Sequence, residues 1–245
     1  MTRVKICGCR NAEQALAAAE AGADFVGIMF AQSPRQVDTE AASDIVRALG
    51  TPLRGLELES PPGLFRAAGS DLTSWFEHGA TALERLLQRK RPLTVGVFAD
   101  NDPEEVNEIV DECGIDLIQL SGGEPWSACL LANRQVIRAV HVSTRDDAAS
   151  AMGRMQTGSA LAVLLDCAHE SLRGGTGQSF DWGVAARIAQ TVPVWLAGGL
   201  TPENVGEAVR VVQPWCVDVS SGVETGGVKD LDKIRAFVKA AKSAV

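Results

Sequence analysis

The sequence predicts an α/β fold in which one domain, residues 1–245, forms a (βα)8 TIM barrel. Short runs of β-branched and other apolar residues alternate with longer segments of helical period, and Gly, Asp, Asn or Pro marks each change. Eight such units follow one another along 245 residues, a length that suits one barrel. Because no change of composition separates two halves, a closed barrel is favoured over an open doubly wound sheet.

The expected strands lie in the apolar runs. Val26–Phe30 and Leu161–Leu165 are apolar at successive positions, which is typical of parallel strands that are covered on both faces. The expected strands are Arg3–Cys7, Asp24–Phe30, Leu93–Phe98, Asp116–Leu120, Gln135–Val140, Leu161–Asp166, Pro193–Ala197 and Cys216–Ser220.

The expected helices begin at polar residues that can accept hydrogen bonds from the first backbone N–H groups. A Thr or Asn cap followed by Pro is favourable, because proline at the first helical position needs no acceptor. The expected openings are Asn11, Asp38-Thr39-Glu40, Asn101-Asp102-Pro103, Gly123-Glu124-Pro125, Ser143-Thr144, Thr201-Pro202-Glu203 and Lys229-Asp230.

Residues 51–91 do not fit the repeating pattern. They supply about forty residues between the second helix and the third strand, where a barrel needs only a short loop. Apolar residues at helical spacing predict an inserted helix from Asp71 to Gln88, weakened at Gly79. The insertion should lie opposite the carboxyl ends of the strands. Its apolar stripe packs either on its own barrel, which is favoured, or on another chain.

Charge and cysteine content exclude several classes of protein. The chain has 23 Lys and Arg against 31 Asp and Glu, a net charge of −8, which disfavours a nucleic-acid partner. No apolar run approaches the roughly 18 residues of a membrane span. The six cysteines are too sparse for a disulfide scaffold and form no Cys-x-x-Cys pair suited to zinc. We therefore expect a cytoplasmic protein without a metal site.

Several polar residues follow directly on expected strands, where barrel enzymes carry their chemistry. Cys7 could act as a base or nucleophile if its surroundings lower the thiol pKa. Asp166 ends an apolar strand, where a carboxylate is costly unless it is paired or functional. Arg35 offers a fork suited to a carboxylate, but a lone loop arginine is equally often a solvated charge.

Glycine-rich loops complete the expected rim. Two of them follow strands seven and eight, where barrels commonly bind a phosphate through backbone N–H groups. The alternative interpretation of each glycine pair is a simple turn. The loops are Gly174-Gly175-Thr176-Gly177, Ala197-Gly198-Gly199-Leu200 and Ser220-Ser221-Gly222-Val223.

Strand alternation also predicts a buried ion pair. Lys5 and Asp218 share the inward parity of Cys7 and Ser220 on the first and last strands, which are neighbours in a closed barrel. We expect the pair to lie below the site.

Taken in order, these segments resemble the phosphoribosylanthranilate isomerases of tryptophan biosynthesis. The resemblance covers the chain except residues 51–91. The matching motifs are Val4-Lys5-Ile6-Cys7-Gly8, Ala23-Asp24-Phe25-Val26-Gly27, Ser33-Pro34-Arg35, Val95-Gly96-Val97-Phe98, Gln119-Leu120, Leu164-Leu165-Asp166, Gly174-Gly175-Thr176-Gly177, Phe180-Asp181-Trp182, Ala197-Gly198-Gly199-Leu200, Pro202-Glu203-Asn204-Val205 and Val217-Asp218-Val219-Ser220-Ser221-Gly222-Val223-Glu224.

The resemblance implies a cofactor-free Amadori rearrangement of N-(5-phosphoribosyl)anthranilate to 1-(2-carboxyphenylamino)-1-deoxyribulose 5-phosphate. It implies that Cys7 is the general base, that Asp166 is the general acid, and that Arg35 binds the anthranilate carboxylate. The partner is a small phosphosugar, and the protein is a monomer or a homodimer. The substrate-binding residues that the resemblance implies are Arg35, Gln119, Gly175, Gly177, Gly198, Gly199, Ser220, Ser221 and Gly222.

The sequence departs from the family pattern at one position near the site. Where the family usually has Gln-Leu-His-Gly, this chain has Gln119-Leu120-Ser121-Gly122, so no role of that histidine can be transferred. Two other functions fit the glycine loops. Another phosphosugar isomerase or epimerase would not need Cys7, Asp166 and Arg35 together, and a non-catalytic phosphate-binding barrel would need neither proton-transfer residue.

Overall fold

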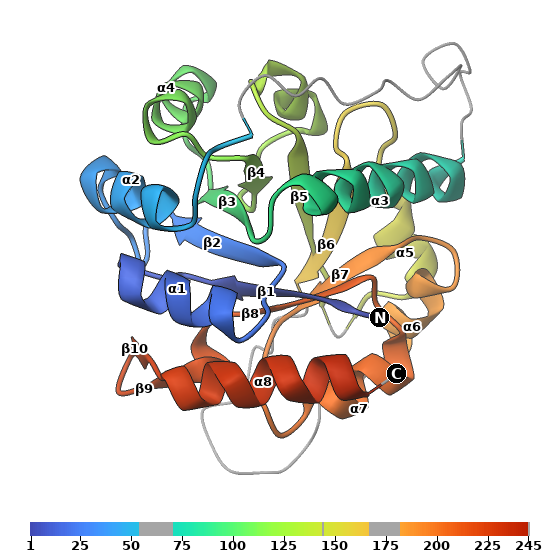
Figure 1. The fold of residues 1–245 in the computed structure, drawn as a ribbon. Helices are drawn as coiled ribbons and strands as arrows, with labels where there is room; N and C mark the ends of the chain where they lie inside the picture. The colour runs from blue at the N-terminus through green and yellow to red at the C-terminus, as the bar shows by residue number, and fades with distance from the viewer. Residues whose placement is uncertain (54–70, 144, 167–181, 245) are drawn as a thin grey trace.

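The computed structural model is a closed barrel in which eight parallel strands pair in sequence order, inside a ring of helices (Figure 1). It describes residues 1–53, 71–143, 145–166 and 182–244. The expected strands are confirmed, each to within one residue at either end. They are β1 (Arg3–Cys7), β2 (Phe25–Met29), β3 (Leu93–Phe98), β4 (Leu117–Leu120), β5 (Val136–His141), β6 (Ala162–Asp166), β7 (Val194–Ala197) and β8 (Cys216–Val219).

Helices follow the strands and cover the outside of the barrel. A short antiparallel hairpin of β9 (Glu224–Thr225) and β10 (Val228–Lys229) precedes the last helix. The helices are α1 (Ala12–Glu20), α2 (Thr39–Ala48), α3 (Leu72–Arg89), α4 (Pro103–Cys113), η2 (Trp126–Leu131), α5 (Ala148–Gly153), α6 (Gly183–Ala189), α7 (Val205–Val212), η3 (Ser221–Val223) and α8 (Leu231–Ser243).

Four of the expected helix openings are confirmed by side-chain caps. Asn11, Asp38, Asp102 and Asp230 each accept a hydrogen bond from a backbone N–H in the first turn of α1, α2, α4 and α8. Pro103 occupies the first position of α4, where no N–H is needed.

At two expected openings the helix begins later than expected, after Asp147 for α5 and after Asn204 for α7. Helix α5 begins after Asp147, which forms a capping box with Ser150, whereas Ser143 donates to Asp146 in the preceding turn. Helix α7 begins after Asn204, whose side chain instead accepts from the N–H of Thr201. Both expected residues therefore shape the turn before the helix.

The helix expected to open at Gly123-Glu124-Pro125, after β4, also differs from the prediction. The segment after Pro125 forms the 3₁₀ helix η2 rather than an α-helix, and no side chain caps its first turn.

Helix α3 lies between α2 and β3 and packs across the amino ends of the strands. The Trp75 indole donates to the Ala160 carbonyl at 2.7 Å, just before β6, and Arg3 at the start of β1 donates to Glu84 at 2.8 Å. Its buried leucines, including Leu83, cluster with apolar residues at the strand starts such as Phe25. The apolar stripe of this segment is thus covered by its own barrel.

Gly79 allows α3 to approach β6 closely. A Cβ atom on this residue would lie 1.9 Å from the backbone oxygen of Leu161. The helix continues through Gly79 without interruption, so the expected weakening at this position is wrong. The glycine is needed for close packing, and its low helix propensity is tolerated.

We predict that Gly79→Ala lowers the free energy of unfolding. Alanine favours a helix by about 1 kcal/mol, but overpacking against backbone at 1.9 Å should cost about 3 kcal/mol, the upper end of the usual range, so the net loss should be about 2 kcal/mol. Denaturant titration measures it. The matched control is Gly153→Ala at the end of α5, where a Cβ meets nothing within 4 Å and stability should be unchanged or slightly higher. An equally stable Gly79→Ala variant would contradict the packing role.

Candidate active site

A cavity of about 200 Å³ opens at the carboxyl ends of the strands. It brings together predicted site residues that lie far apart in the sequence, as a barrel rim should. The predicted residues that line it are Cys7, Gln119, Asp166, Gly198, Gly199, Ser220, Ser221 and Gly222. Gly175 and Gly177 lie outside the described residues.

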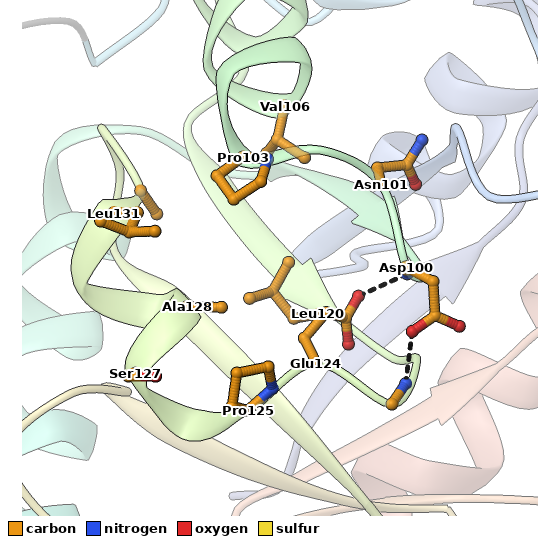
Figure 2. Close-up of a pocket in the computed structure, with 12 residues that line it drawn as sticks. Asp100, Asn101, Pro103, Val106, Leu120, Glu124, Pro125, Ser127, Ala128 and Leu131 are labelled. Atoms are coloured by element: carbon orange, nitrogen blue, oxygen red, sulfur yellow. Dashed lines mark hydrogen bonds between the residues drawn. The ribbon is translucent and has the colours of Figure 1, made fainter.

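A larger cavity of about 420 Å³ lies between α4 and η2 (Figure 2). None of the predicted site residues is among the described residues that line it, and its two carboxylates hold loops together. Glu124 accepts from the N–H of Asp100, and Asp100 accepts from the N–H of Gly123, each at 2.7 Å. We therefore assign the chemistry to the smaller cavity, which holds a thiol and a carboxylate.

Cys7 lies at the end of β1, and only 4% of the residue is exposed. Burial raises the pKa of its thiol, and the nearby Lys5 ammonium opposes that shift. A base role for Cys7 was expected only if its surroundings lowered the thiol pKa, and they raise it instead. Lys5 is the cation that can stabilise a thiolate here once it forms.

The expected ion pair between Lys5 and Asp218 is confirmed. The two residues are register partners on β1 and β8, and Lys5 Nζ lies 2.8 Å from Asp218 Oδ2. Their side chains are 0% and 8% exposed. Burial disfavours the Lys5 ammonium, but the Asp218 carboxylate outweighs burial, so the pKa of Lys5 is raised. Asp218 also lines the cavity, so the pair forms part of its floor.

Asp166 ends β6 beside His141, its register partner at the end of β5. His141 Nδ1 lies 3.4 Å from Asp166 Oδ2, and Nε2 lies 2.9 Å from the backbone oxygen of Ser121. The hydrogen bond to Asp166 raises the pKa of His141. Sequence reasoning missed His141, although it directly follows the expected strand Gln135–Val140.

Arg35 does not line the cavity but packs against Gly8, the residue that follows Cys7. Its Nε and Nη2 atoms donate to the two carboxylate oxygens of Glu224 at 2.6 and 2.8 Å. Lys229 Nζ donates to Glu224 at 2.7 Å and to the backbone oxygen of Ser220 at 3.0 Å. The Arg35 hydrogen bonds, together with Lys229, lower the pKa of Glu224 to about 2.

Glu224 and Lys229 are functional candidates that sequence reasoning did not assign. Glu224 ended one of the family motifs and Lys229 stood in an expected helix opening, but nothing in the sequence placed either beside Arg35. The β9–β10 hairpin does so, since Glu224 and Lys229 are register partners in it.

The loops after β7 and β8 meet at Gly222. A Cβ on this residue would lie 1.8 Å from the backbone oxygen of Leu200, so only glycine allows the two loops to come this close. Asn204 Nδ2 donates to the backbone oxygen of Gly199 at 3.0 Å and fixes the first loop. The arrangement builds a rim of backbone and hydroxyl groups of the kind that binds phosphate.

Gln119 offers an acceptor at the cavity wall. Its side-chain nitrogen donates to the Ser121 hydroxyl at 2.9 Å, while its buried side-chain oxygen has no hydrogen-bond partner among the described residues. A buried acceptor of this kind is satisfied when a ligand donates to it.

Comparisons with known proteins identify the family. A family model described as N-(5'-phosphoribosyl)anthranilate (PRA) isomerase matches residues 66–240. The chain is 39% identical over 249 residues to N-(5'-phosphoribosyl)anthranilate isomerase of Dehalococcoides mccartyi, covering 100% of this chain and 97% of that protein. The chain belongs to the N-(5'-phosphoribosyl)anthranilate isomerase family.

Solved structures of the same family share the barrel. Phosphoribosylanthranilate isomerase from Thermotoga maritima has a TM-score of 0.73 and 34% identity, with 99% of this chain and 100% of that chain covered. A structure of the isomerase with reduced 1-(o-carboxyphenylamino)-1-deoxyribulose 5-phosphate has a TM-score of 0.71 and 33% identity, with the same coverage. The resemblance inferred from the motifs is therefore confirmed. No helix of the described chain is long and apolar enough to cross a membrane.

We predict that Asp218→Ala lowers the free energy of unfolding by about 3–5 kcal/mol, because it leaves the Lys5 ammonium buried without a counter-charge. Denaturant titration provides the measurement. As a control, the double variant Lys5→Met with Asp218→Leu removes both charges and should recover much of the loss. Wild-type stability in Asp218→Ala would show that Lys5 does not depend on this carboxylate.

Proposed function

We propose that this protein isomerises N-(5'-phosphoribosyl)anthranilate to 1-(2-carboxyphenylamino)-1-deoxyribulose 5-phosphate, with Asp166 as general acid and Cys7 as general base. The observation that carries the proposal is one cavity lined by Cys7 of β1, Asp166 of β6 and the glycine loops after β7 and β8. Family membership, and the product analogue bound in a relative, support this substrate and reaction.

The phosphate of the substrate binds to the loops that follow β7 and β8. These loops place Gly198, Gly199, Ser220, Ser221 and Gly222 along one side of the cavity. Lys229 holds the Ser220 backbone and adds a positive charge behind that loop. Gly175 and Gly177 are proposed to complete the site from the loop after β6. Gln119 accepts a hydrogen bond from the sugar on the opposite side.

Asp166 acts in the first chemical step. It donates a proton to the furanose ring oxygen as the bond from that oxygen to C1 breaks, and the nitrogen lone pair forms the C1=N bond, which leaves an open-chain imine that is protonated on nitrogen. The protonated form of Asp166 is therefore the active one, and its carboxylate remains after the step. A positioned general acid of this kind contributes about 10²–10⁴-fold to the rate.

Cys7 acts in the second step. Its thiolate removes the proton from C2, and the electron pair forms an enamine that tautomerises to the ketone. A buried thiolate has a high proton affinity, which suits removal of a proton from carbon, and the Lys5 ammonium stabilises it in the meantime. Because Cys7 and Asp166 lie on different strands of the rim, the sugar need not move between the two steps.

Arg35 binds the carboxylate of the anthranilate ring. Glu224 occupies Nε and Nη2, which leaves Nη1 without a hydrogen-bond partner among the described residues. The bidentate contact fixes the plane of the guanidinium next to Cys7, so the remaining N–H groups can point at an incoming carboxylate. Glu224 is thus a positioning residue for Arg35.

The protein acts as a monomer or a homodimer on a small phosphosugar. A solved structure that is 31% identical to this chain shows monomers generated from the dimeric phosphoribosylanthranilate isomerase of Thermotoga maritima. We place the activity in the cytoplasm, since the described cysteines are free thiols and suit a reducing compartment.

Growth of a tryptophan auxotroph that lacks this isomerase tests the proposal. Expression of the chain should restore growth without tryptophan, and the purified protein should convert the phosphoribosylanthranilate substrate. An Asp166→Asn chain expressed to the same level is the control. Failure of the purified wild-type protein to turn over this substrate would reject the proposed function.

We predict that Cys7→Ser and Asp166→Asn each lower kcat by about 10²–10⁴-fold, because each removes one proton-transfer group. Steady-state kinetics measure the loss, and thermal unfolding near that of the wild type shows that the barrel is intact. Near-wild-type turnover by either variant would reject the role of that residue.

We predict that Arg35→Met raises KM more than Arg35→Lys, since both lose the fork but only methionine loses the charge. Lys229 still pairs with Glu224 in both variants, so the local charge stays partly compensated. KM from initial rates provides the measurement. A KM that neither substitution changes would remove Arg35 from the substrate site.

A further inference from the structure

We propose that His141 is a positioning residue that returns a proton to Asp166 after each turnover. The inference rests on the proposed function, because it concerns the protonation of its general acid. The three residues involved come from the ends of neighbouring strands. Ser121 follows β4, His141 ends β5 and Asp166 ends β6. His141 is not among the described residues that line the cavity, so we assign it a role that acts through Asp166.

The Ser121 backbone oxygen fixes the tautomer of His141. A carbonyl oxygen can only accept a hydrogen bond, so His141 Nε2, 2.9 Å away, carries a proton. Nδ1 then faces Asp166 Oδ2 at 3.4 Å, and one further proton can reside on either atom. The pair is therefore either imidazolium with carboxylate or neutral imidazole with carboxylic acid. The second form is the one that donates a proton to the substrate.

The reaction itself creates the need for a proton relay. After one turnover Asp166 has lost a proton to the ring oxygen, and Cys7 has gained one from C2. The next turnover requires the reverse, with one proton released from Cys7 to water and one taken up from water by Asp166. The side chain of His141 is 58% exposed against 37% for Asp166. An imidazole titrates near neutral pH, so it can take up a proton from solvent and transfer it.

The charged groups around His141 are compatible with this role. The hydrogen bond to Asp166 raises the pKa of His141, whereas the Arg138 guanidinium opposes the shift. Arg138 is itself hydrogen-bonded to backbone oxygens, including that of Leu120. Arg154 donates to the backbone oxygen of His141 and forms an ion pair with Asp146. Among the described residues, Asp166 is the one carboxylate that contacts the imidazole.

The pH profile of kcat tests the relay. In the wild type the pair keeps its mobile proton up to the raised pKa of His141, and the rate falls above it. In His141→Gln no imidazole delivers the proton, so the Asp166 carboxylate must take it directly from solvent, whose hydronium concentration falls a hundredfold between pH 6 and pH 8. We expect kcat of His141→Gln to be about tenfold below that of the wild type near pH 8, and much closer to it near pH 6. The KM of the variant should stay within about twofold of the wild-type value.

His78→Gln is the matched control. His78 lies on α3, which packs across the amino ends of the strands, far from Asp166. The pH profile of that variant should match the wild type. A His141→Gln profile that also matches the wild type, or a change in KM alone, would overturn the proposal.

A titration by nuclear magnetic resonance separates this inference from the proposed function. The His141 imidazole should titrate above its ordinary pKa in the wild type and move down toward that value in Asp166→Asn, with no substrate present. Equal pKa values of His141 in the two proteins would overturn the pairing, whatever reaction the enzyme catalyses. Conversely, the His141 pKa could change in Asp166→Asn while the wild-type protein fails to convert the proposed substrate. That result would reject the proposed function and leave the His141–Asp166 pairing in place.

Discussion

Pairing of β1 with β8 is the contact on which the rest of the barrel depends. It closes the sheet and places Lys5 directly opposite Asp218, more than two hundred positions away in the chain. A buried lysine and a buried carboxylate are each unfavourable alone, so the closed register is the arrangement that compensates both. Cys7 lies two residues after Lys5 on β1, and Ser220 lies two residues after Asp218. The ion pair thus lies below Cys7, the candidate base, and below Ser220, which begins the loop proposed to bind phosphate.

The two ends of the barrel have different tasks. At the amino ends of the strands, α3 covers the opening with Trp75, Leu83 and their neighbours, and Gly79 allows the helix to pack at close range. At the carboxyl ends, polar groups and glycine loops surround an open cavity. Buried apolar clusters elsewhere in the barrel supply stability, so the rim tolerates a buried acceptor without a partner among the described residues, the side-chain oxygen of Gln119.

Charge at the rim is arranged in connected groups that orient one another. Glu224 binds both Arg35 and Lys229, so the cation beside Cys7 and the cation behind Ser220 share one carboxylate. On the other side of the cavity, His141 connects Asp166 with the Ser121 backbone. His141 reaches both partners from β5, the strand that lies between β4 and β6.

The strands, the barrel, helix α3, the Lys5–Asp218 pair and the family could be predicted from the sequence, because they follow from residue periodicity, from strand alternation in a closed barrel or from ordered motifs. Cys7 and Asp166 were found for the same reason, since each ends an apolar run. The folded structure was needed to show how Arg35 is held, that burial raises the pKa of Cys7, and that His141 contacts Asp166. These properties depend on distances between side chains from different strands and on desolvation, which no local pattern encodes.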